Sequence, residues 1–381
     1  MDFNLSEQEL AVQKLARDFA RNEIAPHVMK YDESQEFPME IAKKLGDIGF
    51  LGIIFPEEYG GSGFSTIEYA IIVEEISKVD PSMGLTIAAH NGLCTNHIFS
   101  YANDELKKKY LPDLTTGKKL GAWGLTENVS GSDAAGMATT AERKNGHYII
   151  NGSKLFITHG NVGETAVVTA VTDKSKHKNG ISAFILEKGW KGFKTGKKEN
   201  KLGMRSSDTA ELLFENVEVP AENLIGEEGQ GFKQCMQILD GGRIAIAALS
   251  LGIAQGALDA SLKYSKERKQ FGKSLSEFQG IQFKLSDMAT EADAARLMIY
   301  KAAWMKDKGM NINLSAAMAK LYASEIATKA TNEAIQIHGG YGFIKDFPVE
   351  KLYRDVKLMT IGEGTSEVQK MVIARNILNM F

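Results

Sequence analysis

One carboxylate near the C-terminus has surroundings suited to a general base. Glu363 stands between Gly362 and Gly364 in the stretch IGEGTSEVQ, so a substrate could approach it without meeting neighbouring side chains. Behind it, Ser366 and Gln369 are spaced to form a capping box that starts a helix and anchors the acid. A glutamate in a first helical turn also stabilises the helix dipole, so the residues alone leave both roles open.

A glycine-rich stretch, GLTENVSGSDAAG, could bind a polar ligand. Thr126, Ser132 and the amides around Gly131 could donate hydrogen bonds to a phosphate or to the edge of a polar ring. The stretch is not GxGxxG and no strand–loop–helix unit surrounds it, which disfavours a Rossmann nucleotide site. A plain surface loop is the alternative, because such loops are common connectors.

Two further clusters combine charge with open surface. Arg268, Phe271 and Gln279 lie between two expected helices, where an arginine fork suits phosphate and a phenylalanine face suits an aromatic ring. Asp240 and Arg243 in LDGGRIA share a helical face, and the two glycines between them leave a surface over which a ligand could pass. The alternatives are a solvated or dipole-pairing arginine and an ordinary i,i+3 ion pair.

Composition and the other motifs exclude several classes of function. The net charge of −3 over 381 residues and the lack of a long Lys/Arg run argue against nucleic acid as a partner. The seven histidines have no metal-binding spacing, so we expect no metal and expect His90 and His97 to be structural. No GxSxG motif marks an acyl-transfer nucleophile.

The sequence also predicts a cytoplasmic protein. The N-terminus lacks the pattern of a signal peptide, and no run of about 18 apolar residues could span a bilayer. Cys94 and Cys235 are far apart and outside any CxxC motif, which suits buried thiols in a reducing compartment.

The first of three blocks, residues 1–120, is expected to be mostly helical. Its first helix should begin at a capping box of Ser6 and Glu9, with Leu5 and Leu10 as a hydrophobic staple. The stretches TIEYAIIVEEISKV and NDELKKKYLPDL predict further helices. The apolar face of the first helix is expected at Leu10, Leu15, Phe19 and Ile24.

Residues 121–230 carry period-two alternation, which predicts a small, mainly antiparallel β domain. The expected strands are HYIINGSKLFIT, ETAVVTAVT, GISAFILE and AELLFENVEVP, with turns at Asn151-Gly152 and Asn179-Gly180. Residues 231–381 return to long helices rich in Ala, Gly and Ser, as in a close-packed bundle, and the last of these ends at Gly339-Gly340. The expected fold is therefore mostly α with a central β domain.

Taken in order, these stretches resemble the acyl-CoA dehydrogenase family of flavoproteins, from FNLSEQEL to VIARNIL. That family has an N-terminal helical domain, a small antiparallel β domain and a C-terminal helical bundle. The stretches LDGGRIAIAALSLGIAQGALD, KERKQFGK and YGFIKDFPVEKLYRD are most similar to its bacterial short-chain, butyryl-type branch.

The resemblance implies a role for each matching residue. Glu363 corresponds to the catalytic base, and the acyl-CoA substrate is expected at Ser132, Asp240, Arg243 and Gly364. The FAD contacts implied are Leu125, Thr126, Ser132, Phe156, Thr158, Arg268, Phe271, Gln279, Gln336, Gly339, Gly340, Thr365 and Glu367.

The family's chemistry would explain the placing of Glu363. The base removes the α-proton of a thioester whose carbonyl oxygen is held by the N–H of that same residue and by a ribityl hydroxyl of FAD. The β-hydrogen passes as hydride to flavin N5, which gives a 2-enoyl thioester. Burial beneath the substrate should raise the pKa of the base towards that of the activated α-carbon.

Three departures from the family pattern bear on the site. Asn128 replaces a usual Pro and Ser130 a usual Ala in the TEP-type loop, which could change its stiffness. Gly362 stands where straight-chain members often have Tyr or Phe, so we expect a wider pocket that favours a branched or cyclic acyl group. In the isovaleryl-type branch the base lies instead beside the residue that matches Arg243, but here that neighbour is Gly242 and no second base competes.

The resemblance also implies partners. FAD contacts shared between subunits imply a homotetramer, or at least a dimer, and the family's electron acceptor is an electron-transfer flavoprotein. An acyl-CoA oxidase that uses oxygen, or a catalytically silent flavoprotein or thioester-binding scaffold, is the alternative.

Overall fold

The computed structural model describes residues 4–380, and its N-terminal part is a layer of helices that pack against the long C-terminal helices. The expected helices at TIEYAIIVEEISKV and NDELKKKYLPDL are confirmed as α4 and α7. The N-terminal helices are α1 (Glu7–Phe19), α2 (Val28–Ser34), α3 (Met39–Asp47), α4 (Thr66–Ser77), α5 (Pro81–Ala89), α6 (Asn96–Tyr101) and α7 (Asp104–Thr115), with a π-helical turn, η4 (His90–Thr95), after α5.

The first helix starts as predicted, but its buried face differs. Both hydrogen bonds of the Ser6–Glu9 capping box are present. Leu10 and Leu15, expected to be buried, are 51% and 46% exposed, so that part of the prediction was wrong. The face that packs on α4 is made by Val12, Ala16 and Phe19, and the small Ala16 lets the two helices approach closely.

The β domain is one seven-stranded sheet, mainly antiparallel as predicted. Its strand pairs are antiparallel except for β1 with β4, and for β2 with β4, which meet at a single parallel pair, Thr140 with Val171. The strand order is β1-β4-β2-β3-β7-β6, with β5 also paired to β4. The strands are β1 (Gly121–Gly124), β2 (Thr140–Lys144), β3 (His147–Thr158), β4 (Thr165–Val171), β5 (Ile181–Glu187), β6 (Phe193–Lys198) and β7 (Thr209–Pro220).

The turn expected at Asn151-Gly152 is a bulge instead. Both residues lie inside β3, where the register with β7 shifts between Ile150 and Gly152. Gly152 has φ +142°, and a Cβ there would lie 2.5 Å from the hydroxyl of Thr139, so the position requires glycine. Asn179-Gly180, also expected as a turn, ends a 3-10 helical segment, η6 (Lys174–Gly180), directly before β5.

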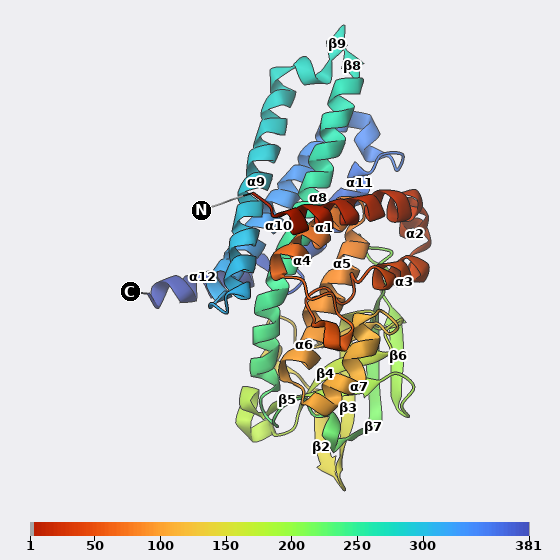
Figure 1. Cartoon of the computed structure of the whole chain (residues 1–381), viewed down its shortest axis with the longest axis vertical. Helices are drawn as coiled ribbons and strands as arrows, with labels where there is room; N and C mark the ends of the chain where they lie inside the picture. Colours follow the sequence, from red (N-terminus) through yellow and green to blue (C-terminus); the bar gives the residue numbers. More distant parts are fainter. Residues whose placement is uncertain (1–3, 381) are drawn as a thin grey trace.

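The C-terminal part is a bundle of long helices, as expected. In Figure 1 the helices α8 to α10 run side by side, with the β8–β9 hairpin at one end and the β domain towards the other, while α12 projects from the body. The fold class is confirmed; the domain limits near residues 120 and 230 stay a prediction. The elements are α8 (Gly231–Glu267), β8 (Lys269–Gln270), β9 (Lys273–Ser274), α9 (Gln279–Asp307), α10 (Asn313–His338), η9 (Gly339–Phe343), α11 (Val349–Asp355), η10 (Val356–Thr360) and α12 (Ser366–Leu378).

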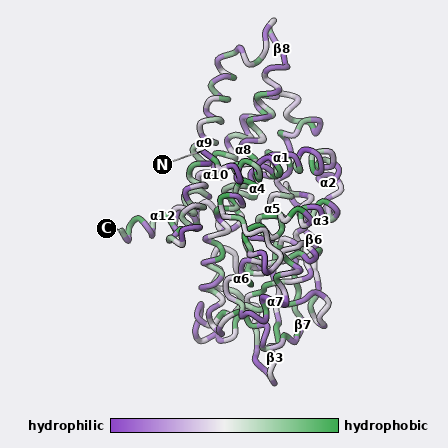
Figure 2. The backbone as a smooth tube through the Cα atoms, in the orientation of Figure 1, coloured by the Kyte–Doolittle hydropathy of each residue, from purple (hydrophilic) through white to green (hydrophobic). Residues whose placement is uncertain are grey.

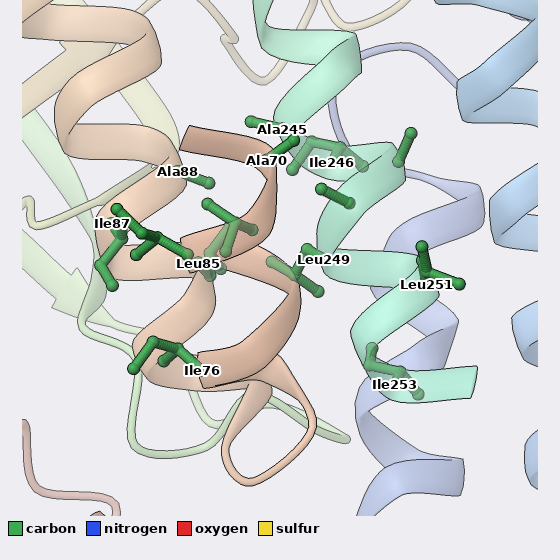
Figure 3. Packing of buried hydrophobic residues seen from close by; sticks show 14 of the residues in the cluster. Ala70, Ile76, Leu85, Ile87, Ala88, Ala245, Ile246, Leu249, Leu251 and Ile253 are labelled. Carbon is green, nitrogen blue, oxygen red and sulfur yellow. The ribbon is translucent and has the colours of Figure 1, made fainter. Parts of the chain in front are cut away.

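Helix α8 forms the centre of the core. A Cβ at Gly252 or at Gly256 would lie 2.5 Å from the carbonyl oxygen of Glu74 or Lys78, so α8 meets the backbone of α4 and of the turn after it. Apolar side chains of α8 face those of α4 and α5 across this contact (Figure 3). Segments made of hydrophobic residues lie mostly in the middle of the molecule (Figure 2). By length and composition α8 could span a membrane, but 83% of its apolar window is buried, as in a core helix.

One buried ion cluster joins the three parts of the chain. Lys351 on α11 donates to Asp80, the N-cap of α5, at 2.8 Å, and to Asp355 at 2.6 Å. Asp355 also accepts the backbone N–H of Met204, which belongs to the segment between β6 and β7. Lys351, Asp80 and Asp355 are each at most 2% exposed, so this cluster, the Lys351 cluster, is shielded from water.

Candidate active site

Glu363 lies in a tight reversal of the chain between η10 and α12. Its φ is +52° and that of Gly364 is +95°, so two consecutive residues adopt the left-handed region. For a residue with a Cβ this conformation costs free energy and persists only where the surroundings impose it.

Side chains from α10 and α12 hold this reversal. Lys320 Nζ donates to the carbonyl oxygen of Gly364 at 2.8 Å, and Gln369 Nε2 donates to the carbonyl oxygens of Gly364 and Glu363 at 3.0 and 3.2 Å. The capping box expected for Ser366 and Gln369 is therefore wrong. Instead Thr365 is the N-cap of α12 and accepts from Val368 N, while Ser366 donates to Glu325 on α10.

The carboxylate of Glu363 is shielded although the residue as a whole is only half-buried. Its Oε2 is removed from solvent and has no hydrogen-bond partner. Burial raises the pKa of Glu363 to about 7, against the opposing charges of Lys320 and Arg243. The group can therefore gain and lose a proton near neutral pH.

Glycines make the space in which this carboxylate lies. A Cβ at Gly242 on α8 would be 2.1 Å from Glu363 Oε2 and 3.4 Å from Leu93. Gly92 in η4 faces the same spot, since a Cβ there would be 3.1 Å from the hydroxyl of Tyr69 and 4.0 Å from the Cα of Gly242. The carboxylate thus occupies the volume that a side chain at position 242 would need.

Asp240 and Arg243 form the i,i+3 ion pair that was one of the two expectations. Arg243 Nη1 pairs with Asp240 Oδ1, which also accepts from Asn313 Nδ2 at 2.8 Å. Arg243 is 5% exposed, and its Nε has no partner. Asp240 and Arg243 flank Gly241 and Gly242, and Gly242 is the glycine that faces Glu363, so both features belong to one region of α8.

The glycine-rich loop is held by a buried ion pair that the sequence did not single out. Glu127 accepts from the backbone N–H groups of Ala138 and Thr139 and pairs with Lys154 at 2.6 Å. Lys154 is fully buried and also donates to the carbonyl oxygen of Leu125 at 3.1 Å. The loop is therefore pinned despite the replacement of the family's proline.

The other predicted residues of this region lie on the glycine-rich loop after β1 and on the end of β3. Leu125 is buried against the start of α8, Thr126 is half-buried, and its carbonyl oxygen accepts from Leu155 N at 2.8 Å. Thr158 is half-buried, Ser132 is exposed, and Phe156 is 63% exposed with φ +59°. Thr126 is therefore hydrogen-bonded to the residue before Phe156, and Thr158 lies two residues further along β3.

A second set of predicted residues lies at the far end of the bundle. Arg268 ends α8, Phe271 is 94% exposed at the tip of the β8–β9 hairpin, and Gln279 is the exposed first residue of α9 (Figure 1). A cavity of about 550 Å³ opens there, lined among others by Arg268, Tyr264, His338, Gly339 and Gly340. Exposed Gln336 lies on the same stretch of α10, whereas Thr365 and exposed Glu367 lie beside Glu363.

Histidines and acids do not form a metal site in the described part of the chain. Among residues 4–380 no group of three or more His, Cys, Asp or Glu side chains is placed to hold an ion. His90 is hydrogen-bonded to Leu114 O and Gly121 N, and His97 to Gln234 and Trp123, so both have structural partners.

Comparison with known proteins identifies the family. Family models match at residues 6–118 (acyl-CoA dehydrogenase, N-terminal domain), 122–217 (middle domain) and 229–378 (C-terminal domain). The short-chain-specific acyl-CoA dehydrogenase of Clostridium acetobutylicum is 50% identical over 99% of this chain and 100% of its own length. A subunit of the caffeyl-CoA reductase-Etf complex of Acetobacterium woodii is 45% identical over 98% of this chain and 99% of its own. The structure of butyryl-CoA dehydrogenase from Megasphaera elsdenii has a TM-score of 0.98 at 46% identity and covers 99% of this chain and 100% of that one. The predicted resemblance is confirmed: this chain belongs to the acyl-CoA dehydrogenase family.

Proposed function

We propose that this enzyme catalyses the FAD-dependent α,β-dehydrogenation of a short-chain acyl-CoA, with Glu363 as the base. The observation that carries the proposal is the carboxylate itself, whose Oε2 is shielded, unpartnered and lies against Gly242. A base with a pKa of about 7 is half ionised at neutral pH, where it can accept the α-proton efficiently. Asp240 and Arg243 are proposed to contact the acyl-CoA, with Ser132 and Gly364 beside the thioester.

The residues present fit FAD. Thr126, Phe156 and Thr158 offer an apolar ring and two hydroxyls to a flavin ring, and Leu125, next to Thr126, is anchored in the core. Glu363 would take the α-proton while its own N–H holds the carbonyl oxygen. When bound, FAD supplies the acceptor for the β-hydrogen.

The second set of proposed FAD contacts supports an oligomer. Arg268 lies about 43 Å along α8 from Leu239, which packs beside Leu125, and one extended dinucleotide does not reach that far. The cavity at Arg268, Gly339 and Gly340 would then hold the nucleotide part of a cofactor bound mainly by a neighbouring subunit, with Phe271, Gln279 and Gln336. We propose a homotetramer, or at least a dimer, on this basis.

The acyl group is proposed to be short, with room for a branch or ring. Gly362 leaves open the space beside Leu358, since a Cβ there would be 3.5 Å or more from its nearest neighbours, and its φ is not in the left-handed region. A side chain could therefore be built at this position, and its absence supports a wider pocket.

The electron partner is proposed to be an electron-transfer flavoprotein, and the location cytoplasmic. The similar subunit from Acetobacterium woodii belongs to a reductase-Etf complex. Cys94 and Cys235 are buried free thiols that suit a reducing compartment.

The Acetobacterium woodii relative also favours a second candidate function, the reverse reduction of a 2-enoyl-CoA. A pKa of about 7 lets Glu363 donate a proton to the α-carbon as readily as it accepts one.

The test is the visible spectrum of the purified, oxygen-free protein before and after addition of butyryl-CoA and then of a cyclic acyl-CoA. We expect a flavin band that bleaches with at least one thioester, and faster bleaching with the cyclic compound would support the wide pocket. A flavin band that no acyl-CoA bleaches, or a flavin-free protein, would contradict the proposal. Peroxide formed in air at the rate of turnover would indicate the oxidase alternative, and reoxidation by enoyl-CoA outpacing bleaching would indicate the reductase.

A substitution at Gly242 should separate activity from stability. In Gly242→Ala the new methyl group displaces the carboxylate of Glu363, whose side chain is flexible, so the rate of flavin reduction should fall by about 100-fold. The melting temperature should not fall, because the atom that moves is the end of a side chain and alanine favours a helix. Gly252→Ala should instead lower the melting temperature and leave the rate of flavin reduction close to that of the wild type, since its Cβ meets the backbone of Glu74. Rapid-mixing kinetics and thermal melts measure both, and a wild-type rate in Gly242→Ala would show that the carboxylate does not act from this position.

A further inference from the structure

A buried lysine stands behind the proposed base. Lys320, in the first third of α10, is fully buried, and its Nζ donates to the carbonyl oxygen of Gly364, the residue directly after Glu363. It forms no ion pair with any carboxylate among residues 4–380. An ammonium group taken out of water without an ion-pair partner is unfavourable unless a nearby negative charge compensates for it.

The compensating charge is that of Glu363. Burial lowers the pKa of Lys320 to about 8, and Glu363 is the strongest influence in the opposite direction. The relation is mutual, because Lys320 is the strongest influence that opposes the raised pKa of Glu363. The two charges thus interact across the peptide that Lys320 holds.

The carbonyl oxygen of Gly364 accepts hydrogen bonds from two side chains, Lys320 and Gln369. Gln369 is fully buried and donates to the same Gly364 oxygen as Lys320, and also to the carbonyl oxygen of Glu363. Both residues therefore hold the left-handed backbone from which the Glu363 side chain extends. They differ in charge, since the lysine is a cation and the glutamine is neutral.

Other charged groups nearby have a weaker effect than Lys320 on the ionisation of Glu363. Arg243 is already paired with Asp240, which neutralises much of its effect, and exposed carboxylates are screened by water. The titratable or charged groups that face Lys320 and Glu363 from the packed elements are Tyr69 of α4, Asp240 and Arg243 of α8, Glu325 of α10 and Glu367 of α12.

We infer that Lys320 is a positioning residue for Glu363: it fixes the peptide after the base, and its positive charge favours the ionised form of the carboxylate. This inference rests on the proposed role of Glu363. The bland alternative is that Lys320 is only a structural donor that satisfies one carbonyl group at the end of a turn.

Three variants distinguish the positioning role of Lys320 from the purely structural one. Lys320→Gln keeps a donor but removes the charge, Gln369→Leu removes the neutral donor alone, and Lys329→Gln removes an exposed lysine of α10 that pairs with Glu291. Lys320→Met, which brings no polar group into the core, replaces Lys320→Gln if that variant does not fold. The pH profile of anaerobic flavin reduction is measured on each holoenzyme.

We expect Lys320→Gln to move the acid limb of the profile up by about one pH unit and to slow reduction at neutral pH by about fivefold. Gln369→Leu should lower the rate at every pH without moving the limb, and Lys329→Gln should match the wild type. A rate loss in Lys320→Gln with an unmoved limb would overturn the inference in favour of the structural alternative.

A second readout needs no turnover. The infrared carboxyl band that is lost in Glu363→Gln can be titrated in the substrate-free holoenzyme, and in Lys320→Gln its midpoint should move to higher pH. An unmoved midpoint contradicts the inference even if Glu363 is the base. Conversely, a moved midpoint with full turnover in Glu363→Gln would refute the proposed base while leaving the coupling of the two charges intact.

Discussion

Glu363→Gln is expected to bind FAD normally and to lose about 10³-fold in the rate of flavin reduction, because the amide cannot accept the α-proton. The replacement has the same shape, and Oε2 has no hydrogen bond to lose, so the fold should be unaffected. In the wild type the competent form is the carboxylate. The rate should therefore rise as the pH increases through about 7, and this limb should be absent in the variant.

The control is Glu218→Gln, an exposed carboxylate on β7 that lies outside the proposed site. Its rate should stay close to that of the wild type, since an exposed charge is screened by water and salt. Stopped-flow absorbance with a bleaching thioester gives both rates. Turnover in Glu363→Gln that equals the control would place the base elsewhere.

Lys351→Met should cost the most stability of any single change considered, about 3–5 kcal/mol, because it leaves Asp80 and Asp355 as buried carboxylates without a cation. Burial alone would lower the pKa of Lys351, but Asp355 and Asp80 raise it above the ordinary value. The contribution is therefore fully present at neutral pH and is lost only when the pH rises through the folded-state pKa.

For a chain of this length the expected loss corresponds to a fall in melting temperature of roughly 5 °C, measured by calorimetry on the holoenzyme. The control is Lys14→Met, which breaks an exposed pair with Asp18 and should change stability by less than ~0.5 kcal/mol. Adding Asp355→Asn to Lys351→Met should recover part of the loss, since one uncompensated charge is removed. Equal melting temperatures for Lys351→Met and Lys14→Met would show that the cluster does not join the three parts of the chain as described.

Strong local patterns predicted most of the elements. The run HYIINGSKLFIT became β3 from end to end, and the long Ala-rich stretches became α8, α9 and α10. In the seven-stranded sheet the missed strands were β1, β2 and β6, whose sequences GAWG, TAERK and FKTGKK lack apolar alternation. These strands form because neighbours in the sheet complete their hydrogen bonds, which no local pattern reveals.

The sequence predicted the proposed base and its flanking glycines, but not the side chains that hold the backbone around them. Glu363 and the glycines around it were visible, yet two adjacent hydroxyls, Thr365 and Ser366, could each have capped α12, and the contact of Ser366 with Glu325 decided between them. Lys320 was missed altogether. The available signal was a lysine within SAAMAKLYASE, on the face of a helix that otherwise carries small apolar residues.

The contact between Gly242 and Glu363 also limits how this site could evolve. The two positions share one volume, so a carboxylate can be carried by the helix or by the loop but not by both. A lineage that moved its base from one to the other would have to pass through a sequence with a clash or with no base at all. Each single change would then be deleterious although the pair is functional, which is reciprocal sign epistasis, and it predicts that the two placements of the base are separated by a deep fitness valley.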